Sequence, residues 1–113
     1  MRTNQEDLIR YKDGSLYCEL ADTWIDPSKP VKRALITHAH FDHFTFGCEE
    51  YLSTKETAIL LKERVGENIK IKTFDYGEDF KINGINISFH PSGHILGSCQ
   101  IRFIFAEEKW LIS

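Results

Sequence analysis

The sequence has few cysteines, and no two of them form the pair that a cysteine metal site would use. Cys18, Cys48 and Cys99 are widely spaced, and no Cys-x-x-Cys arrangement occurs. This spacing argues against a disulfide framework and against a cysteine-based zinc site. A reducing, cytoplasmic setting is therefore expected.

Long apolar runs and an excess of one charge are also missing. No stretch approaches the roughly 18 apolar residues of a membrane-spanning helix, and the first ten residues, MRTNQEDLIR, lack the apolar region of a secretory signal. We therefore expect no membrane association. The formal net charge of −3 does not indicate an electrostatic nucleic-acid binder, although cations held in a site would lie outside this count.

What the chain does contain is the pattern of one α+β domain of 113 residues. A helix is expected over 54–65, with Ser53 and Glu56 at capping-box spacing and Gly66 as its end. Its buried stripe would be Ala58, Leu61 and Val65. Short strands are expected over 15–20, 23–26, 32–37, 51–53 and 69–74.

The clearest structural signal is "FKINGINISF" at 80–89. Asn83-Gly84 is typical of a two-residue type I′ turn. The apolar residues alternate around that turn, so one side of the hairpin would face a core. A further hairpin is expected across 106–108. These hairpins predict a largely antiparallel sheet.

All five histidines lie in two short segments: His38, His40 and His43, then His90 and His94. In "HAHFDH", an extended chain would place His38 and His40 on one side, as a pair of nitrogen donors for zinc. Asp42 and His43 follow and could serve a second cation. Imidazoles and a carboxylate crowded in this way are costly to desolvate unless a metal coordinates them. The sequence therefore predicts a metal site, in which manganese or iron could replace zinc.

"HAHFDH" and the later "PSGHILGS" resemble the two motifs of the metallo-β-lactamase-fold hydrolases. The segments "YCELADTWIDP" and "SGHILGS" are most similar to the nuclease branch with a β-CASP insertion, namely the ligase-associated DNA exonucleases and their mRNA 3′-end-processing relatives. The resemblance implies the N-terminal half of an αββα sandwich. It also implies metal-dependent hydrolysis of phosphodiester bonds in DNA or RNA, with association with a DNA ligase.

The same resemblance assigns roles to individual residues. His38, His40 and His94 would hold one zinc, while Asp42 and His43 would be ligands and catalytic residues at a second. Asp26 would support the metal loop from behind, since an outer carboxylate can orient a ligand histidine through its other ring nitrogen. Spacing alone does not choose between His90 and His94 as the distant ligand.

The resemblance stops short of the family's full pattern. The Gly-Asp pair expected after "KWLIS", whose aspartate bridges the metals, is absent, as are the β-CASP insertion and the later histidines. The chain matches an N-terminal portion, and alone it is expected to be inactive. Alternatives are an RNA-processing nuclease, a small-molecule metallo-hydrolase of the same fold, and a non-catalytic metal-binding fragment or half of a split enzyme.

Overall fold

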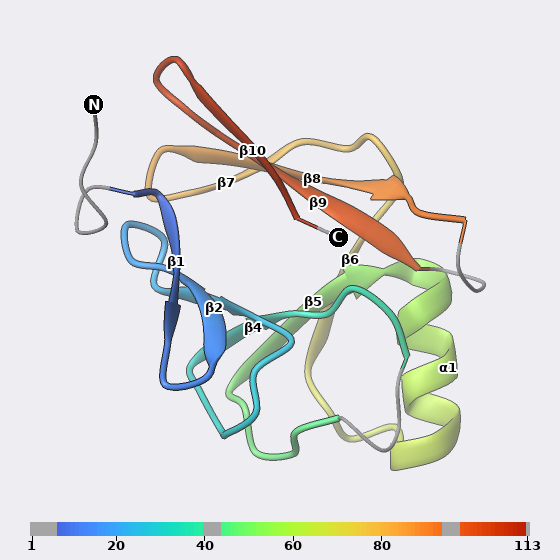
Figure 1. The fold of residues 1–113 in the computed structure, drawn as a ribbon. Coiled ribbons are helices and arrows are strands. Elements are labelled where there is room, and N and C mark those ends of the chain that lie inside the picture. The colour runs from blue at the N-terminus through green and yellow to red at the C-terminus, as the bar shows by residue number, and fades with distance from the viewer. Residues whose placement is uncertain (1–6, 40–43, 94–97, 113) are drawn as a thin grey trace.

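The computed structural model describes residues 7–39, 44–93 and 98–112. These residues form three layers, which are one helix, a six-stranded sheet and a four-stranded sheet (Figure 1). The predicted α+β class with one main helix is confirmed.

The six-stranded sheet runs along the chain in sequence order. Its strands are β1 (Ile9–Lys12), β2 (Ser15–Cys18), β3 (Thr23–Ile25), β4 (Arg33–Leu35), β5 (Glu50–Thr54) and β6 (Ile71–Phe74). The first three strands pair antiparallel, whereas β3 to β6 pair in parallel. The last five strands overlap the predicted segments. The parallel arrangement places the carboxyl ends of β3 and β4 at one edge of the sheet.

Strand β1 is an element that the sequence analysis missed. It forms a hairpin with β2 through Asp13 and Gly14, whose φ angles are 52° and 82°. An Asp-Gly pair with both φ angles positive is typical of a type I′ turn. That dipeptide was therefore an available signal for the hairpin.

Helix α1 (Lys55–Val65) packs against β5 and β6 and begins one residue later than predicted. The predicted capping box at Ser53 is wrong, because Thr54 is the N-cap and its hydroxyl accepts a hydrogen bond from the Thr57 N–H at 3.2 Å. Gly66 ends the helix as predicted, with φ 109°.

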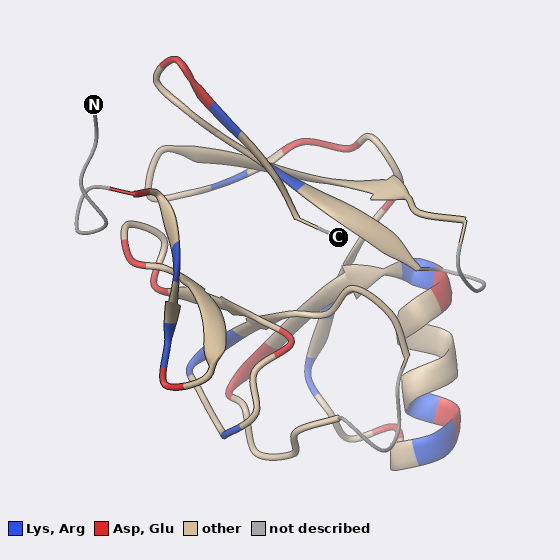
Figure 2. Cartoon of the chain, in the orientation of Figure 1, with Lys and Arg blue, Asp and Glu red and all other residues tan. Residues whose placement is uncertain are grey.

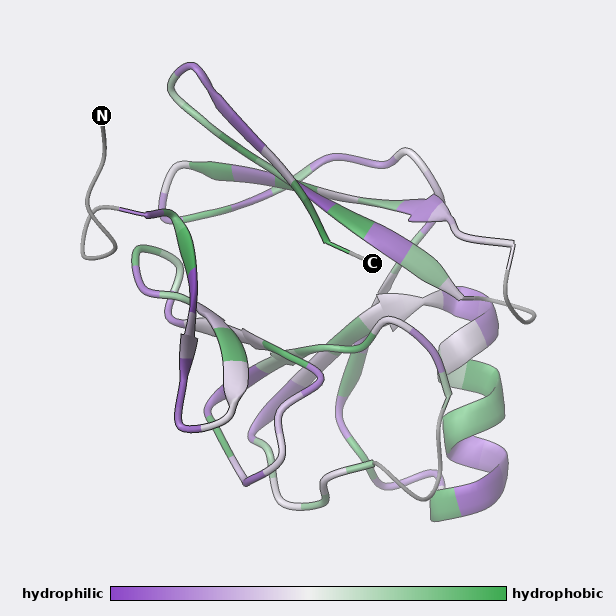
Figure 3. Ribbon diagram, in the orientation of Figure 1, coloured by the Kyte–Doolittle hydropathy of each residue, from purple (hydrophilic) through white to green (hydrophobic). Residues whose placement is uncertain are grey.

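The four-stranded sheet is antiparallel throughout. Its strands are β7 (Phe80–Ile82), β8 (Ile85–Pro91), β9 (Cys99–Phe105) and β10 (Glu108–Ile112), in the order β10-β9-β8-β7. Asn83 and Gly84 have φ angles of 50° and 81°, which confirms the predicted type I′ turn. Figure 3 shows hydrophobic and hydrophilic residues alternating along β9, as expected of a sheet with one buried face.

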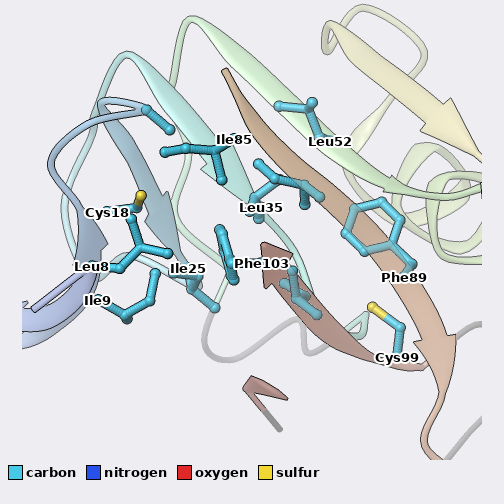
Figure 4. Close-up of a cluster of buried hydrophobic side chains, with 13 residues drawn as sticks. Leu8, Ile9, Cys18, Ile25, Leu35, Leu52, Ile85, Phe89, Cys99 and Phe103 are labelled. Carbon is cyan, nitrogen blue, oxygen red and sulfur yellow. The ribbon is translucent and has the colours of Figure 1, made fainter. Parts of the chain in front are cut away.

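Two apolar clusters lie on opposite faces of the six-stranded sheet. The inter-sheet cluster includes Leu35 and Leu52 from one sheet and Phe89 and Phe103 from the other, and Figure 4 shows these side chains meeting between the sheets. The helix-side cluster consists of Ala34, Ile36, Ala39, Tyr51 and Leu61. Successive residues of β4 and β5 thus face opposite layers, so α1 covers the face that the second sheet leaves open. Of the predicted helix stripe, Ala58 and Leu61 are buried and Val65 is half-buried.

Candidate metal centre

The candidate site begins where β3 and β4 end side by side. Asp26 follows β3, and its backbone N–H donates to the Leu35 carbonyl at 2.9 Å. The φ angle of Asp26 is 44°, a left-handed conformation that non-glycine residues rarely adopt and that aspartate tolerates better than most. The turn aims the Asp26 carboxylate at the first residues beyond β4.

Thr37 is the hydrogen-bond partner of that carboxylate. The Thr37 N–H donates to Asp26 Oδ1 at 3.0 Å, and the Thr37 hydroxyl donates to Asp26 Oδ2 at 2.6 Å. Thr37 Oγ1 also lies 2.6 Å from Nδ1 of His38, the first predicted metal ligand. A chain of hydrogen bonds therefore runs from Asp26 through Thr37 to the half-buried His38.

Strand β9, which follows the second histidine segment in the sequence, is hydrogen-bonded to the same residue, Thr37. The Cys99 N–H donates to the Thr37 carbonyl at 2.8 Å. The hydroxyls of Ser92 and Ser98 lie 2.7 Å apart, so the two flanks of residues 94–97 are joined. The residues that border both predicted ligand segments are thus held together at Thr37.

Cys99 also reports on the electrostatics of this region. Burial, together with a smaller contribution from the negative charge of Asp26, raises the pKa of the Cys99 thiol to about 12. The thiol is therefore protonated at neutral pH, so Cys99 fits a packing role better than a role as thiolate ligand.

The segment that follows "HAHFDH" in the sequence is anchored separately. The Thr45 hydroxyl donates to the Pro27 carbonyl at 2.5 Å, and the Tyr51 hydroxyl donates to the Thr45 carbonyl at 2.6 Å. The Phe44 ring stacks on Tyr51 with centroids 5.1 Å apart. A cavity of about 380 Å³ opens beside His38. It is lined by Asp26, Pro27, Ser28, Ile36, His38, Phe44, Thr45 and Tyr51.

Comparison with solved structures gives the fold. The flavodiiron protein from Giardia intestinalis matches with a TM-score of 0.59 and 19% identity, over 79% of this chain and 29% of its own. A B3 metallo-β-lactamase with an active-site glutamic acid matches with a TM-score of 0.58 and 16% identity, over 92% and 53%. CmlA, a diiron β-hydroxylase from Streptomyces venezuelae, matches with a TM-score of 0.55 and 16% identity, over 92% and 27%.

The protein has a metallo-β-lactamase-like fold. No protein-family profile matches the sequence. A relative from Opitutus terrae named "Probable DNA ligase" is 31% identical over 105 residues, which are 92% of this chain. The chain spans about a tenth of that relative's length.

Only some of the predicted site residues of this metallo-β-lactamase-like fold can be placed. His38 and Asp26 lie together as described above, whereas His40, Asp42, His43 and His94 fall outside the described residues. Within 7–39, 44–93 and 98–112, no three His, Cys, Asp or Glu side chains gather as metal ligands would. The predicted roles of all these residues therefore remain predictions.

His90, the alternative to His94, is engaged within its own strand. It lies half-buried on β8, and its Nε2 is 2.8 Å from the Ser88 hydroxyl. Thr37 is the residue that the sequence analysis missed. Its signal was a hydroxyl directly before the first histidine, at the end of a buried strand. In the part of the chain that the structure describes, no helix is long and apolar enough to cross a membrane.

Proposed function

We propose that this chain supplies the first metal-binding segments of a metal-dependent hydrolase that cleaves phosphodiester bonds in DNA. The fold supports the hydrolase class, and the name of the Opitutus terrae relative supports a DNA context. The observation that carries the proposal is the hydrogen bond from the Cys99 N–H to the Thr37 carbonyl, because it joins the borders of both histidine segments.

In this proposal, His38, His40 and His94 hold one zinc ion, and Asp42 and His43 hold and assist a second. His38 fits such a role, since Thr37 engages Nδ1 and the ring's other nitrogen is Nε2. Imidazole nitrogens suit zinc, and manganese or iron can occupy similar sites. When bound, such ions supply Lewis acidity toward a phosphoryl oxygen.

The other residues of the site would orient the metal ligands and hold the substrate. Asp26 acts from behind the metal loop, and its hydrogen-bond path to His38 runs through Thr37. The cavity beside His38 offers a concave surface of aromatic and polar side chains. Association with a DNA ligase remains part of the proposal, supported by the name of the relative.

The distribution of surface charge favours recognition of a nucleic acid at the site over binding along a charged face of the protein. Figure 2 shows basic and acidic residues side by side on α1. Lys55 pairs with Asp75 at 3.1 Å, and Lys72 pairs with Glu50 at 3.2 Å. Paired charges of both signs give little long-range attraction for a nucleic acid.

Metal binding is tested on the 113-residue chain. We expect zinc to bind in calorimetry and elemental analysis, and binding to fall in the His38→Ala and His94→Ala variants. His90→Ala is the matched control and should retain zinc. Well-folded chain without bound transition metal after supplementation would overturn the proposal, as would loss of zinc in His90→Ala alone.

Substrate class is tested on the natural gene product, whatever its length. Cleavage of single-stranded DNA, RNA and a chromogenic lactam is compared with and without added zinc or manganese. Metal-dependent cleavage of DNA is expected. Turnover of RNA alone or of the lactam alone would replace the DNA assignment with one of the alternative hydrolase functions.

A further inference from the structure

Thr37 uses all of its polar groups in the site, although no ligand role is assigned to it. The whole residue is 3% exposed. Its N–H and hydroxyl both face Asp26, its carbonyl accepts from Cys99, and its Oγ1 meets the His38 ring. A residue needed only for packing would not require this set of partners.

The hydroxyl proton of Thr37 determines what His38 must contribute. A threonine hydroxyl has one proton to donate and lone pairs that accept. The Asp26 carboxylate can only accept, so the 2.6 Å contact with Oδ2 takes that proton. In the second 2.6 Å contact, Oγ1 must therefore accept, and His38 Nδ1 must carry a hydrogen.

We propose that Thr37 is a positioning residue that fixes His38 as the Nδ1–H tautomer, so that Nε2 is the nitrogen offered to a metal ion. This inference rests on the proposed metal-binding function. Metal-ligating histidines commonly donate their other ring N–H to an oxygen acceptor, which fixes both the tautomer and the ring orientation. Here a threonine hydroxyl is inserted between the ring and the carboxylate.

The role requires a group that accepts from His38 and donates to Asp26 at the same time. Serine meets that requirement, whereas valine has nearly the same shape as threonine and lacks the hydroxyl. Thr37→Val and Thr37→Ser therefore separate the hydroxyl from the volume of the side chain. Thr23→Val is the matched control, since Thr23 is also buried and its hydroxyl donates to the Ala21 carbonyl at 2.8 Å.

The tautomer is read from the ring ¹⁵N chemical shifts of His38 in metal-free chain at about pH 9, where imidazole is neutral. We expect the Nδ1–H pattern in the parent chain, in Thr37→Ser and in Thr23→Val. Thr37→Val should show a mixture of tautomers or the Nε2–H form. An Nε2–H pattern in the parent chain would overturn the inference, as would an unchanged pattern in Thr37→Val.

Zinc affinity gives the second reading. Loss of such an outer partner typically weakens metal binding about 10–100-fold, so we expect a decrease of that order in Thr37→Val and recovery to within a few-fold in Thr37→Ser. Equal affinity in Thr37→Val and the parent chain would contradict the role. If the parent chain binds no zinc, the proposed function fails, while the ¹⁵N shifts still decide the tautomer.

Discussion

The inter-sheet cluster and the helix-side cluster are built on opposite faces of one sheet, yet they differ in character. Between the sheets, the cluster consists of large apolar side chains, with Phe89 and Phe103 fully buried. On the helix side, the cluster is smaller and includes Tyr51, whose hydroxyl holds the segment after the histidine motif. We infer that the first cluster sets the stability of the fold and the second sets the placement of the site.

The same division follows the chain into the site. Leu35, the last residue of β4, faces the second sheet, and Ile36 faces the helix side. Thr37 then makes hydrogen bonds with Asp26, which follows β3, and with Cys99, which begins β9. The site therefore lies where residues of the inter-sheet cluster and of the helix-side cluster adjoin. Substitutions in the inter-sheet cluster should alter mainly the stability of the fold. Substitutions in the helix-side cluster should alter mainly the geometry of the site.

The largest difference is expected between two fully buried leucines, one in each cluster. Leu35 and Leu61 are both 0% exposed. A buried Leu→Ala change costs about 2–5 kcal/mol, depending on how far the surroundings relax. We expect Leu35→Ala, enclosed by two sheets, to lose about 4–5 kcal/mol. Leu61→Ala, on the buried face of the single helix α1, should lose about 2–3 kcal/mol.

Urea unfolding followed by circular dichroism measures both losses in the free energy of unfolding. Ile59→Ala is the control for removing a large side chain from α1, because Ile59 is 65% exposed. A loss in Leu61→Ala equal to or greater than that in Leu35→Ala would show that the helix-side cluster carries as much stability.

Alkaline pH should weaken the inter-sheet cluster first, because it contains two buried thiols. Burial and, to a smaller extent, the charge of Asp26 raise the pKa of Cys99 to about 12, and burial also raises the pKa of Cys18. A thiol in the unfolded chain loses its proton at about pH 8.5. Full stability is therefore present below that pH. It declines as pH rises toward the folded pKa, by about 1.4 kcal/mol per pH unit for each thiol.

Urea unfolding between about pH 7.5 and 9 measures this slope while most tyrosines, with an unfolded pKa of about 10, are still protonated. Cys99→Ala should reduce the slope by the share of one thiol. Cys48→Ala, which removes a half-buried thiol outside the inter-sheet cluster, is the matched control. An identical slope in the parent chain and in Cys99→Ala would contradict the assignment.

Much of the inter-sheet layer could be predicted from the sequence, because period-2 alternation and Asn83-Gly84 are local signals. The helix was also predictable, although Ser53 and Thr54 are adjacent candidates for its cap and only the backbone path decides between them. The hairpin before β2 was missed despite its Asp-Gly turn.

The site was predictable in its residue types and not in its connections. "HAHFDH" marks candidate ligands through local spacing, and Asp26 was expected to support them. That Asp26 acts on Thr37, and that the Thr37 carbonyl receives Cys99, depends on the pairing of β3 with β4 and on how the two sheets pack. Contacts between distant segments leave no periodic trace in the sequence.

The smallest expected effect on stability, and the sharpest on the site, comes from Tyr51→Phe. The Tyr51 hydroxyl donates to the Thr45 carbonyl at 2.6 Å and accepts from the Cys48 N–H at 3.2 Å. Its loss should cost about 1 kcal/mol in the free energy of unfolding. Zinc affinity should fall as well, because residues 44–48 directly follow Asp42 and His43 in the sequence.

Tyr17→Phe provides the matched comparison, since the Tyr17 hydroxyl donates to Asp22 Oδ1 at 2.9 Å. Tyr17 lies on β2 of the same sheet, three strands away from Tyr51 on β5. We expect a similar loss of stability and unchanged zinc affinity, measured by urea unfolding and calorimetry on the same preparations. If both variants lowered zinc affinity equally, the effect would follow general stability. The helix-side cluster would then have no separate role in holding the site. That result would contradict the inference that one cluster sets stability and the other sets the placement of the site.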